Sequence, residues 1–252
     1  MFAKRVVARL DIKAPNLIKG IHLEGLRVIG NPSAYAKEYY LQGADELIYI
    51  DVVASLYERS SIHELVKLTA QDVFVPLTVG GGVRTLHDVE KMLHSGADKI
   101  AVNTAAVKNP NFITEVAKQF GNQCFVLSIE AKYCSPNRWE ALYDNGREHS
   151  GLNVVEWCRQ AEDLGAGEIL LTSVDREGTR KGFDIDLIKA VSSKVSIPVI
   201  ASGGCGEIDH VLAPLSECNA NAVALADILH YERAKISDIK LKMMLNGIEV
   251  RI

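Results

Sequence analysis

The sequence lacks the features that mark secreted and membrane-spanning proteins. Its 252 residues contain no uninterrupted apolar run of the ~18 residues that a transmembrane helix needs. The amino terminus has neither the apolar segment nor the small-residue cleavage site of a signal peptide. We therefore expect a cytoplasmic protein that does not contact a membrane.

Paired cysteines and an excess of one charge are also absent. The five cysteines form no C-x-x-C pair and their number is odd, which argues against a disulfide framework or a structural zinc site. With 28 basic and 32 acidic residues the net charge is −4, so the sequence predicts no broad basic surface for nucleic acid. The seven histidines show no metal-binding spacing. We expect no metal, no cofactor and no nucleic-acid partner.

What the sequence does contain is a regular alternation of apolar runs and amphipathic stretches. Most runs are rich in Val, Ile and Leu without strict alternation, which is typical of parallel strands covered by helices. Eight such strands separated by about eight helices predict a (β/α)₈ barrel, an α/β fold in a single domain. A doubly wound sheet is disfavoured, because no glycine-rich turn follows the first strand. The predicted strands are 5–11, 46–52, 73–79, 99–103, 124–130, 168–174, 198–202 and 222–226, and the helices include 33–42, 87–94, 111–120 and 154–164.

The two halves of the chain resemble each other. The segment PLTVGGG at residues 76–82 parallels PVIASGG at residues 198–204. Polar or small residues that end predicted strands recur at nearly the same period, which favours two fused half-barrels, about 1–121 and 122–252. The matching strand ends are Asp11 with Glu130, Asp51 with Asp175, and Asn103 with Ala226.

Glycine-rich turns follow two of the predicted strands at the end where barrels of this kind place their active sites. Glycine lets backbone N–H groups approach an anion, and a helix that follows adds partial positive charge. Two such turns half a barrel apart suit a long substrate with a phosphate at each end, although tight βα turns without a ligand are the alternative. The first cradle consists of Gly80, Gly81, Gly82, Asn103 and Thr104, and the second consists of Gly203, Gly204, Ala226 and Asp227.

Motifs along the whole chain point to one family. They include AKR at residues 3–5, TVGGG at 78–82, GADK at 96–99, NTAA at 103–106, GAGEILLTS at 165–173 and ASGG at 201–204. In these motifs the chain resembles the cyclase subunit of imidazole glycerol phosphate synthase, an enzyme of histidine biosynthesis. The resemblance implies that ammonia from a separate glutaminase subunit passes through the barrel to a doubly phosphorylated ribulosyl aminoimidazole substrate. The imidazole ring then closes, and an aminoimidazole carboxamide ribotide leaves.

The resemblance also implies two catalytic carboxylates. The family's first carboxylate falls on Asp11, and its second, normally an aspartate, falls on Glu130. Paired carboxylates across a cavity can move protons when their surroundings separate their pKa values. The predicted substrate- and phosphate-binding residues are Lys19, in the loop expected after strand 1, with Gly82, Asn103, Thr104, Thr172, Glu177, Gly178, Gly204, Ala226 and Asp227.

Charged residues begin four of the strands at the opposite end of the barrel. Arg5, Glu46, Lys99 and Glu168 fall on the family's salt-bridge ring at the ammonia entrance, where two cations and two anions can pair. Asp98 falls on a position that contacts the glutaminase. The resemblance thus implies a heterodimer with a glutaminase subunit.

Four residues depart from the family's pattern at the substrate end. Glu130 and Glu177 are each one methylene longer than the expected aspartate, and Asp227 replaces a phosphate-binding serine that would not repel the ligand. Arg9 replaces a cysteine one pleat below Asp11. Because alternate residues of a strand share a face, we expect Arg9 to point into the barrel, where it could pair with Asp11, Glu130 or Asp227.

These departures leave other functions open. A related barrel could conduct ammonia from a glutaminase to another enzyme that installs an acetamidino group on a surface sugar. A non-catalytic scaffold could serve only to activate the glutaminase, although Asp11 and Lys19 would then have no purpose.

Overall fold

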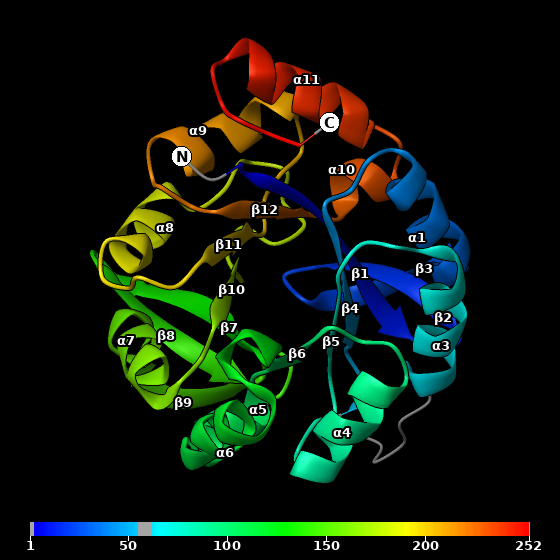
Figure 1. Cartoon of the computed structure of the whole chain (residues 1–252). Coiled ribbons are helices and arrows are strands. Elements are labelled where there is room, and N and C mark those ends of the chain that lie inside the picture. The colour runs from blue at the N-terminus through cyan, green and yellow to red at the C-terminus, as the bar shows by residue number, and fades with distance from the viewer. Residues whose placement is uncertain (1–2, 55–61, 252) are drawn as a thin grey trace.

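The computed structural model describes residues 3–54 and 62–251, which close into a parallel barrel (Figure 1). The barrel strands are β1 (Arg5–Lys13), β4 (Glu46–Asp51), β5 (Leu77–Gly80), β6 (Lys99–Val102), β7 (Phe125–Ser135), β10 (Glu168–Ser173), β11 (Val199–Ser202) and β12 (Ala222–Leu225). They neighbour one another in the order β10, β11, β12, β1, β4, β5, β6 and β7, and β10 also pairs with β7. The predicted (β/α)₈ barrel is confirmed.

Helices surround the strands (Figure 1). Helices predicted at 111–120 and 154–164 match the structure to the residue, since a glycine follows each of them, and the Asn153 side chain caps the second by accepting from the amide of Val155. No helix in the described ranges is long and apolar enough to cross a bilayer. The helices are α1 (Pro32–Leu41), α3 (Ile62–Asp72), α4 (Leu86–His94), α5 (Thr104–Lys108), α6 (Asn111–Phe120), α7 (Val154–Leu164), α8 (Ile185–Ser192), α9 (Leu212–Ser216), α10 (Asp227–His230) and α11 (Ile236–Leu245), with 3₁₀ turns at Asn122–Cys124 and Ile208–Val211.

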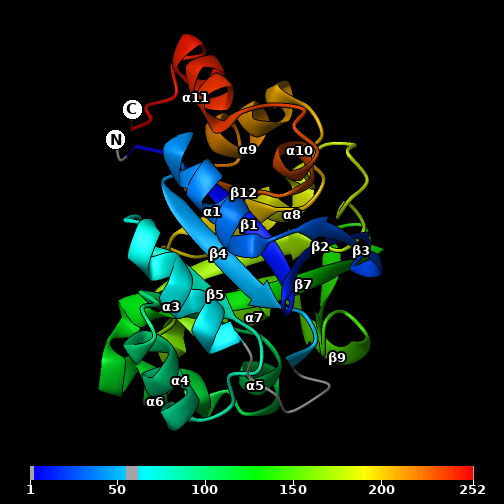
Figure 2. The ribbon, with the colours of Figure 1, turned by 90° about the vertical axis from the view of Figure 1, so that its right-hand side faces the viewer.

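Two antiparallel hairpins extend the barrel and were not predicted. The strands β2 (Asn16–Ile21) and β3 (Glu24–Gly30) follow β1, and β8 (Arg138–Tyr143) and β9 (Glu148–Asn153) follow β7. Figure 2 shows β2, β3 and β9 on one side of the barrel. Each half of the chain thus contributes four barrel strands and one hairpin. The boundary between half-barrels at about residue 121 stays a prediction.

Strand β5 begins four residues later than predicted. The apolar run at 73–79 indicated a strand, but β5 begins only at Leu77. The amide of Val73 still donates to the carbonyl of Thr69, so this residue continues the end of α3, and Phe74 is exposed. Apolar content alone therefore did not separate the end of a helix from the start of a strand.

The inside of the barrel is layered along its axis. Inward-facing residues of β1 are Arg5, Val7, Arg9 and Asp11, because alternate residues share a face. Val7 belongs to an apolar layer, so a charged group lies on β1 both below it and above it. That layer comprises Val7, Ile48, Ala101, Val126, Leu170, Ile200, Ala222 and Ala224.

Candidate active site

Asp11 and Glu130 lie on opposite walls of the barrel. Asp11 is on β1 and Glu130 is on β7, four positions apart in the ring of eight strands. Both side chains are buried. Asp11 lies near the carboxyl end of β1, and Glu130 lies near the end of the part of β7 that pairs with β10, before β7 continues into its hairpin. Glu130 lines a hollow of about 80 Å³ together with the first cradle, and Asp11 lines one of about 30 Å³ together with the second. Each predicted catalytic carboxylate therefore lies beside one predicted phosphate cradle.

The carboxyl group of Glu130 is poised to carry a proton. Its Oε2 atom is buried and has no hydrogen-bond partner among the described residues. Burial raises the pKa of Glu130 from 4.5 to about 7, although the nearby charge of Arg9 opposes the shift. A carboxylic acid that titrates near neutral pH can donate a proton to a leaving group.

Arg9 occupies the centre of the site. Its Nε donates to Oδ1 of Asp11 over 2.9 Å, and its Nη1 donates to the hydroxyl groups of Thr172 and Ser202 over 2.8 and 3.2 Å. Of the three predicted partners, Asp11, Glu130 and Asp227, the structure thus pairs Arg9 with Asp11. Burial by itself would lower the pKa of Arg9, but the charges of Asp11, Glu177 and Glu130 and the hydrogen bond to Asp11 together raise it, and the guanidinium stays charged.

The first cradle is closed by the hairpin that follows β7. A Cβ atom on Gly81 would lie 2.2 Å from the carbonyl oxygen of Asp51, so only glycine fits this turn. The Asn103 side chain donates to the carbonyl of Leu142, and the Thr104 hydroxyl accepts from the amide of Asp144. Both predicted ligand residues thus also hold the hairpin over the hollow.

The second cradle is filled by an ion pair. Lys19 lies in strand β2 and not in a loop, which corrects the prediction, and its Nζ contacts Oε1 of Glu177. The other oxygen of Glu177 accepts the amide of Leu23 over 2.9 Å. Gly178 and Gly204 both have positive φ, and Gly178 packs against the β2 backbone. A phosphate here would have to separate Lys19 from Glu177.

Two arginines neutralise Asp227, the predicted second-cradle residue that follows Ala226. Arg180 donates to both of its carboxylate oxygens over 2.8 and 3.2 Å, and Arg233 lies 3.4 Å from one of them. Both guanidinium groups also lie over the ring of Tyr231. The repulsion expected between Asp227 and a phosphate is therefore offset by two neighbouring positive charges.

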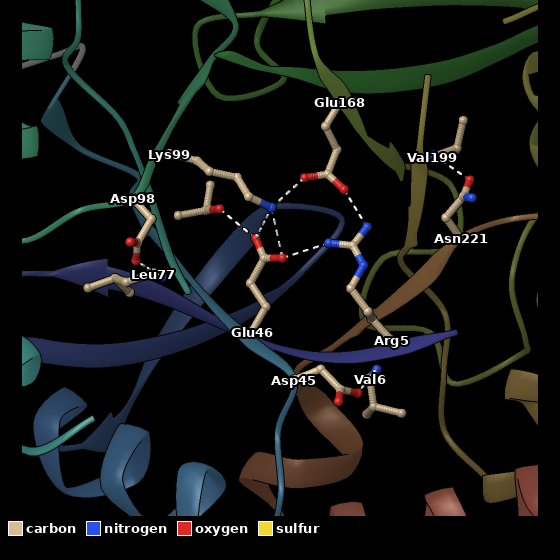
Figure 3. Close-up of polar contacts among 11 residues, drawn as sticks. Arg5, Val6, Asp45, Glu46, Leu77, Asp98, Lys99, Glu168, Val199 and Asn221 are labelled. Carbon is tan, nitrogen blue, oxygen red and sulfur yellow. Dashed lines mark hydrogen bonds and ion pairs between the residues drawn. The ribbon is translucent and has the colours of Figure 1, made fainter. Parts of the chain in front are cut away.

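The four charged residues at the other end of the barrel form a closed ring (Figure 3). Arg5 pairs with Glu46 over 2.7 Å and also with Glu168, while Lys99 pairs with the same two glutamates over 2.9 and 2.7 Å. The Thr78 hydroxyl donates to Glu46 from the inner side. A hollow lined by Arg5, Lys99 and Glu168 opens outside this charged ring.

Asp98 lies one residue before Lys99 at the same end. Its carboxylate accepts the amide of Leu77 over 2.8 Å, and the residue is exposed. Figure 3 shows it beside the charged ring. Nothing in the structure tests its predicted contact with a glutaminase.

Sequence reasoning did not place three further groups beside the site. His230 is buried against the Tyr39 hydroxyl, which lies 2.7 Å from its Nδ1, and burial lowers its pKa to about 4. Arg180 and Arg233 come from two separate loops, and only the charge of Asp227 could have suggested them. No cluster of three or more metal-binding side chains occurs in residues 3–54 and 62–251, and the expectation of a metal-free site stays a prediction.

Comparison with known proteins gives independent evidence on the family of the chain. A family model described as "Histidine biosynthesis protein" matches residues 5–235. A protein of Legionella pneumophila, imidazole glycerol phosphate synthase subunit HisF, is 65% identical over 205 residues, which are 81% of this chain and 97% of that protein.

Proposed function

The chain belongs to the histidine biosynthesis protein family, and on that premise we propose that it is the cyclase subunit of an imidazole glycerol phosphate synthase. It is a lyase that uses ammonia to convert the phosphoribulosyl aminoimidazole carboxamide ribotide into imidazole glycerol phosphate, aminoimidazole carboxamide ribotide and water. The identity to HisF favours this reaction over a sugar-amination paralogue or a scaffold. The observation that carries the proposal is the pair of buried carboxylates, Asp11 and Glu130, facing each other above a charged ring.

The surroundings of the two carboxylates suggest a division of roles. Asp11, held as an ion pair by Arg9, accepts a proton from the ammonia nitrogen as this nitrogen bonds to the substrate. Glu130, whose pKa lies near 7, donates a proton to the departing group. One group therefore serves as the base and the other as the acid at the same neutral pH.

The two cradles bind the phosphates at the ends of the substrate. The first supplies Gly82, Asn103 and Thr104, where the backbone approaches the ligand closely. In the second, Lys19 exchanges Glu177 for a phosphate, because a dianion competes well for a buried ammonium group. Thr172, Gly178, Gly204, Ala226 and Asp227 complete the second phosphate site.

A glutaminase subunit binds at the charged ring and supplies the ammonia. The end of the barrel near Asp98 offers this partner an exposed carboxylate beside a hollow of about 440 Å³. Arg5, Glu46, Lys99 and Glu168 then act as the gate through which ammonia enters the barrel. We place this complex in the cytoplasm, where the five free cysteines would stay reduced.

Turnover with ammonium salt tests the function without the partner. The purified chain, the ribotide substrate and ammonium are mixed, and the loss of substrate absorbance is followed. We expect turnover that Asp11→Asn lowers by a factor on the order of 10²–10⁴. An inactive wild-type chain of intact fold would overturn the proposal.

A second assay tests the partner. Asp98→Ala should weaken glutamine-driven turnover with an added glutaminase, while ammonium-driven turnover is retained. Asp98 precedes the first residue of β6, so it lies at the opposite end of the barrel from Asp11 and Glu130. Equal loss in both assays would show that Asp98 does not act through the glutaminase.

A further inference from the structure

The side chain of Arg9 reaches across the inside of the barrel. It starts on β1, yet its Nη1 is bonded to Ser202 on β11 and Thr172 on β10. These strands are the second and third neighbours of β1 in a ring of eight, so the guanidinium lies well inside the barrel and not along its wall. The bond between its Nε and Asp11 fixes the near end of the group.

Arg9 lies between the charged ring and the reacting centre. Arg5 belongs to the ring, Val7 to the apolar layer, and Asp11 to the candidate site, and all four residues face inward from one strand. At a rise of about 3.3 Å per residue, the Cα atom of Arg9 lies roughly 13 Å above that of Arg5 and 7 Å below that of Asp11 along the strand. The guanidinium reaches from there up to the Asp11 carboxylate. The guanidinium therefore lies beside the axis of the barrel at the point where this axis reaches Asp11.

Strands β5 and β7 present small residues on their inner faces near this place. By alternation with Thr78 and Glu130, the residues Gly80 and Ser128 face inward from β5 and β7. Ile50 of β4 covers Gly80, since a Cβ there would come within 2.8 Å of its Cδ1, so both Ile50 and Arg9 border the axis here. Arg9 is the charged member of this pair, and it is buried and held by three hydrogen bonds to side chains.

We propose that Arg9 is a second gate, which restricts the passage of ammonia between the charged ring and Asp11. The inference rests on the proposed function, because it assumes that ammonia travels along this axis. The guanidinium must swing away from Thr172 and Ser202 for each molecule that passes. The gate slows only the ammonia that comes from glutamine through the charged ring. The proposal therefore predicts that a large share of the nitrogen in the product comes from bulk ammonia, which reaches Asp11 from the substrate side.

A competition between two nitrogen sources measures this gate. The complex of the chain with its glutaminase receives unlabelled glutamine and nitrogen-15 ammonium together, and mass spectrometry gives the label in the imidazole product. Both sources react at the same carboxylates, so any damage to Asp11 cancels from the ratio. Arg9→Ala should raise the ratio of glutamine-derived to bulk-derived nitrogen by about tenfold, equal to ~1.4 kcal/mol of barrier.

Two further variants make the test specific. Val7→Ala widens the axis in the apolar layer without touching Arg9, and its ratio should equal that of the wild type. Arg9→Lys keeps a positive charge near Asp11 but cannot make the same set of bonds, and should give an intermediate ratio. It also serves as the test if Arg9→Ala does not fold.

The outcomes separate this inference from the function itself. An unchanged ratio in both Arg9 variants, with product still formed, overturns the gate and leaves the cyclase intact. An equal increase in Val7→Ala also overturns it, because the restriction would then lie elsewhere on the axis. No product from either nitrogen source in the wild type overturns the proposed function, and the gate with it.

Discussion

Glu130 is the proton donor whose titration should limit turnover above neutral pH. Its carboxyl group is buried, with one oxygen lacking a partner among the described residues, and burial raises its pKa from 4.5 to about 7. A glutamate of ordinary pKa would be protonated in only ~0.3% of molecules at pH 7, whereas about half of the Glu130 side chains carry the proton. Burial thus raises the fraction of competent acid by about two orders of magnitude.

The expected pH profile follows from this acid role. With saturating substrate and a constant concentration of free NH₃, kcat should fall by up to tenfold per unit as pH rises above about 7. Glu130→Gln should lower kcat by ~10²–10⁴ and remove this dependence, because an amide cannot donate the proton in the same way. Glu130→Asp keeps a carboxyl group and should keep an alkaline limb.

The measurement is kcat between about pH 5.5 and about pH 8.5 for the three proteins. The ratio of wild type to Glu130→Gln at each pH removes the titration of the substrate from the comparison. An alkaline limb that survives unchanged in Glu130→Gln would refute the assignment of Glu130 as the acid. A wild-type limb with its midpoint below about pH 5 would refute the effect of burial.

Three further predictions concern the fold and the second cradle. Gly204→Ala should lower the free energy of unfolding in urea by ~2–4 kcal/mol, and Gly25→Ala should lower it by about 1 kcal/mol. Both glycines have positive φ, but only a Cβ at Gly204 would meet a backbone oxygen, 2.1 Å away. Equal losses in the two variants would contradict this reasoning. Burial lowers the pKa of His230 to about 4, so the unfolded chain takes up a proton at a higher pH than the folded chain does. Acidification from pH 6.5 to pH 4 should therefore cost the wild type about 2.5 kcal/mol more than His230→Gln; parallel unfolding curves would count against it. Glu177→Gln should lower the KM for the substrate by about threefold, because the substrate phosphate competes with Glu177 for Lys19. Lys19→Met removes the group that binds the phosphate and should raise the KM tenfold or more. A higher KM in both variants would exclude that competition.

The barrel strands and several helices could be predicted because local signals and burial agree there. A glycine follows helix 111–120, and the apolar residues that recur at helical spacing along it are buried. The hairpins were missed for different reasons. Asn145-Gly146 is a common hairpin turn and could have been found, whereas His22 and Leu23 adopt positive φ in the other turn without any such signal.

Some features of the site could likewise be predicted from the sequence, and others could not. Strand ends and alternation placed Asp11, Glu130 and the inward direction of Arg9, because these depend only on the period of a strand. The hydrogen bonds of Arg9 to Thr172 and Ser202 could not be predicted, because they depend on which residues β10 and β11 bring to it. The pairing of Asp227 with Arg180 joins loops that only tertiary structure brings together.

The most direct test of the central claim follows the nitrogen atom. The chain is incubated with the ribotide substrate and nitrogen-15 ammonium, and both products are weighed by mass spectrometry. The proposed function predicts equal amounts of imidazole glycerol phosphate carrying the label and of aminoimidazole carboxamide ribotide without it. Unconverted substrate, or label in the ribotide product, would contradict the assignment of this barrel as an ammonia-using cyclase.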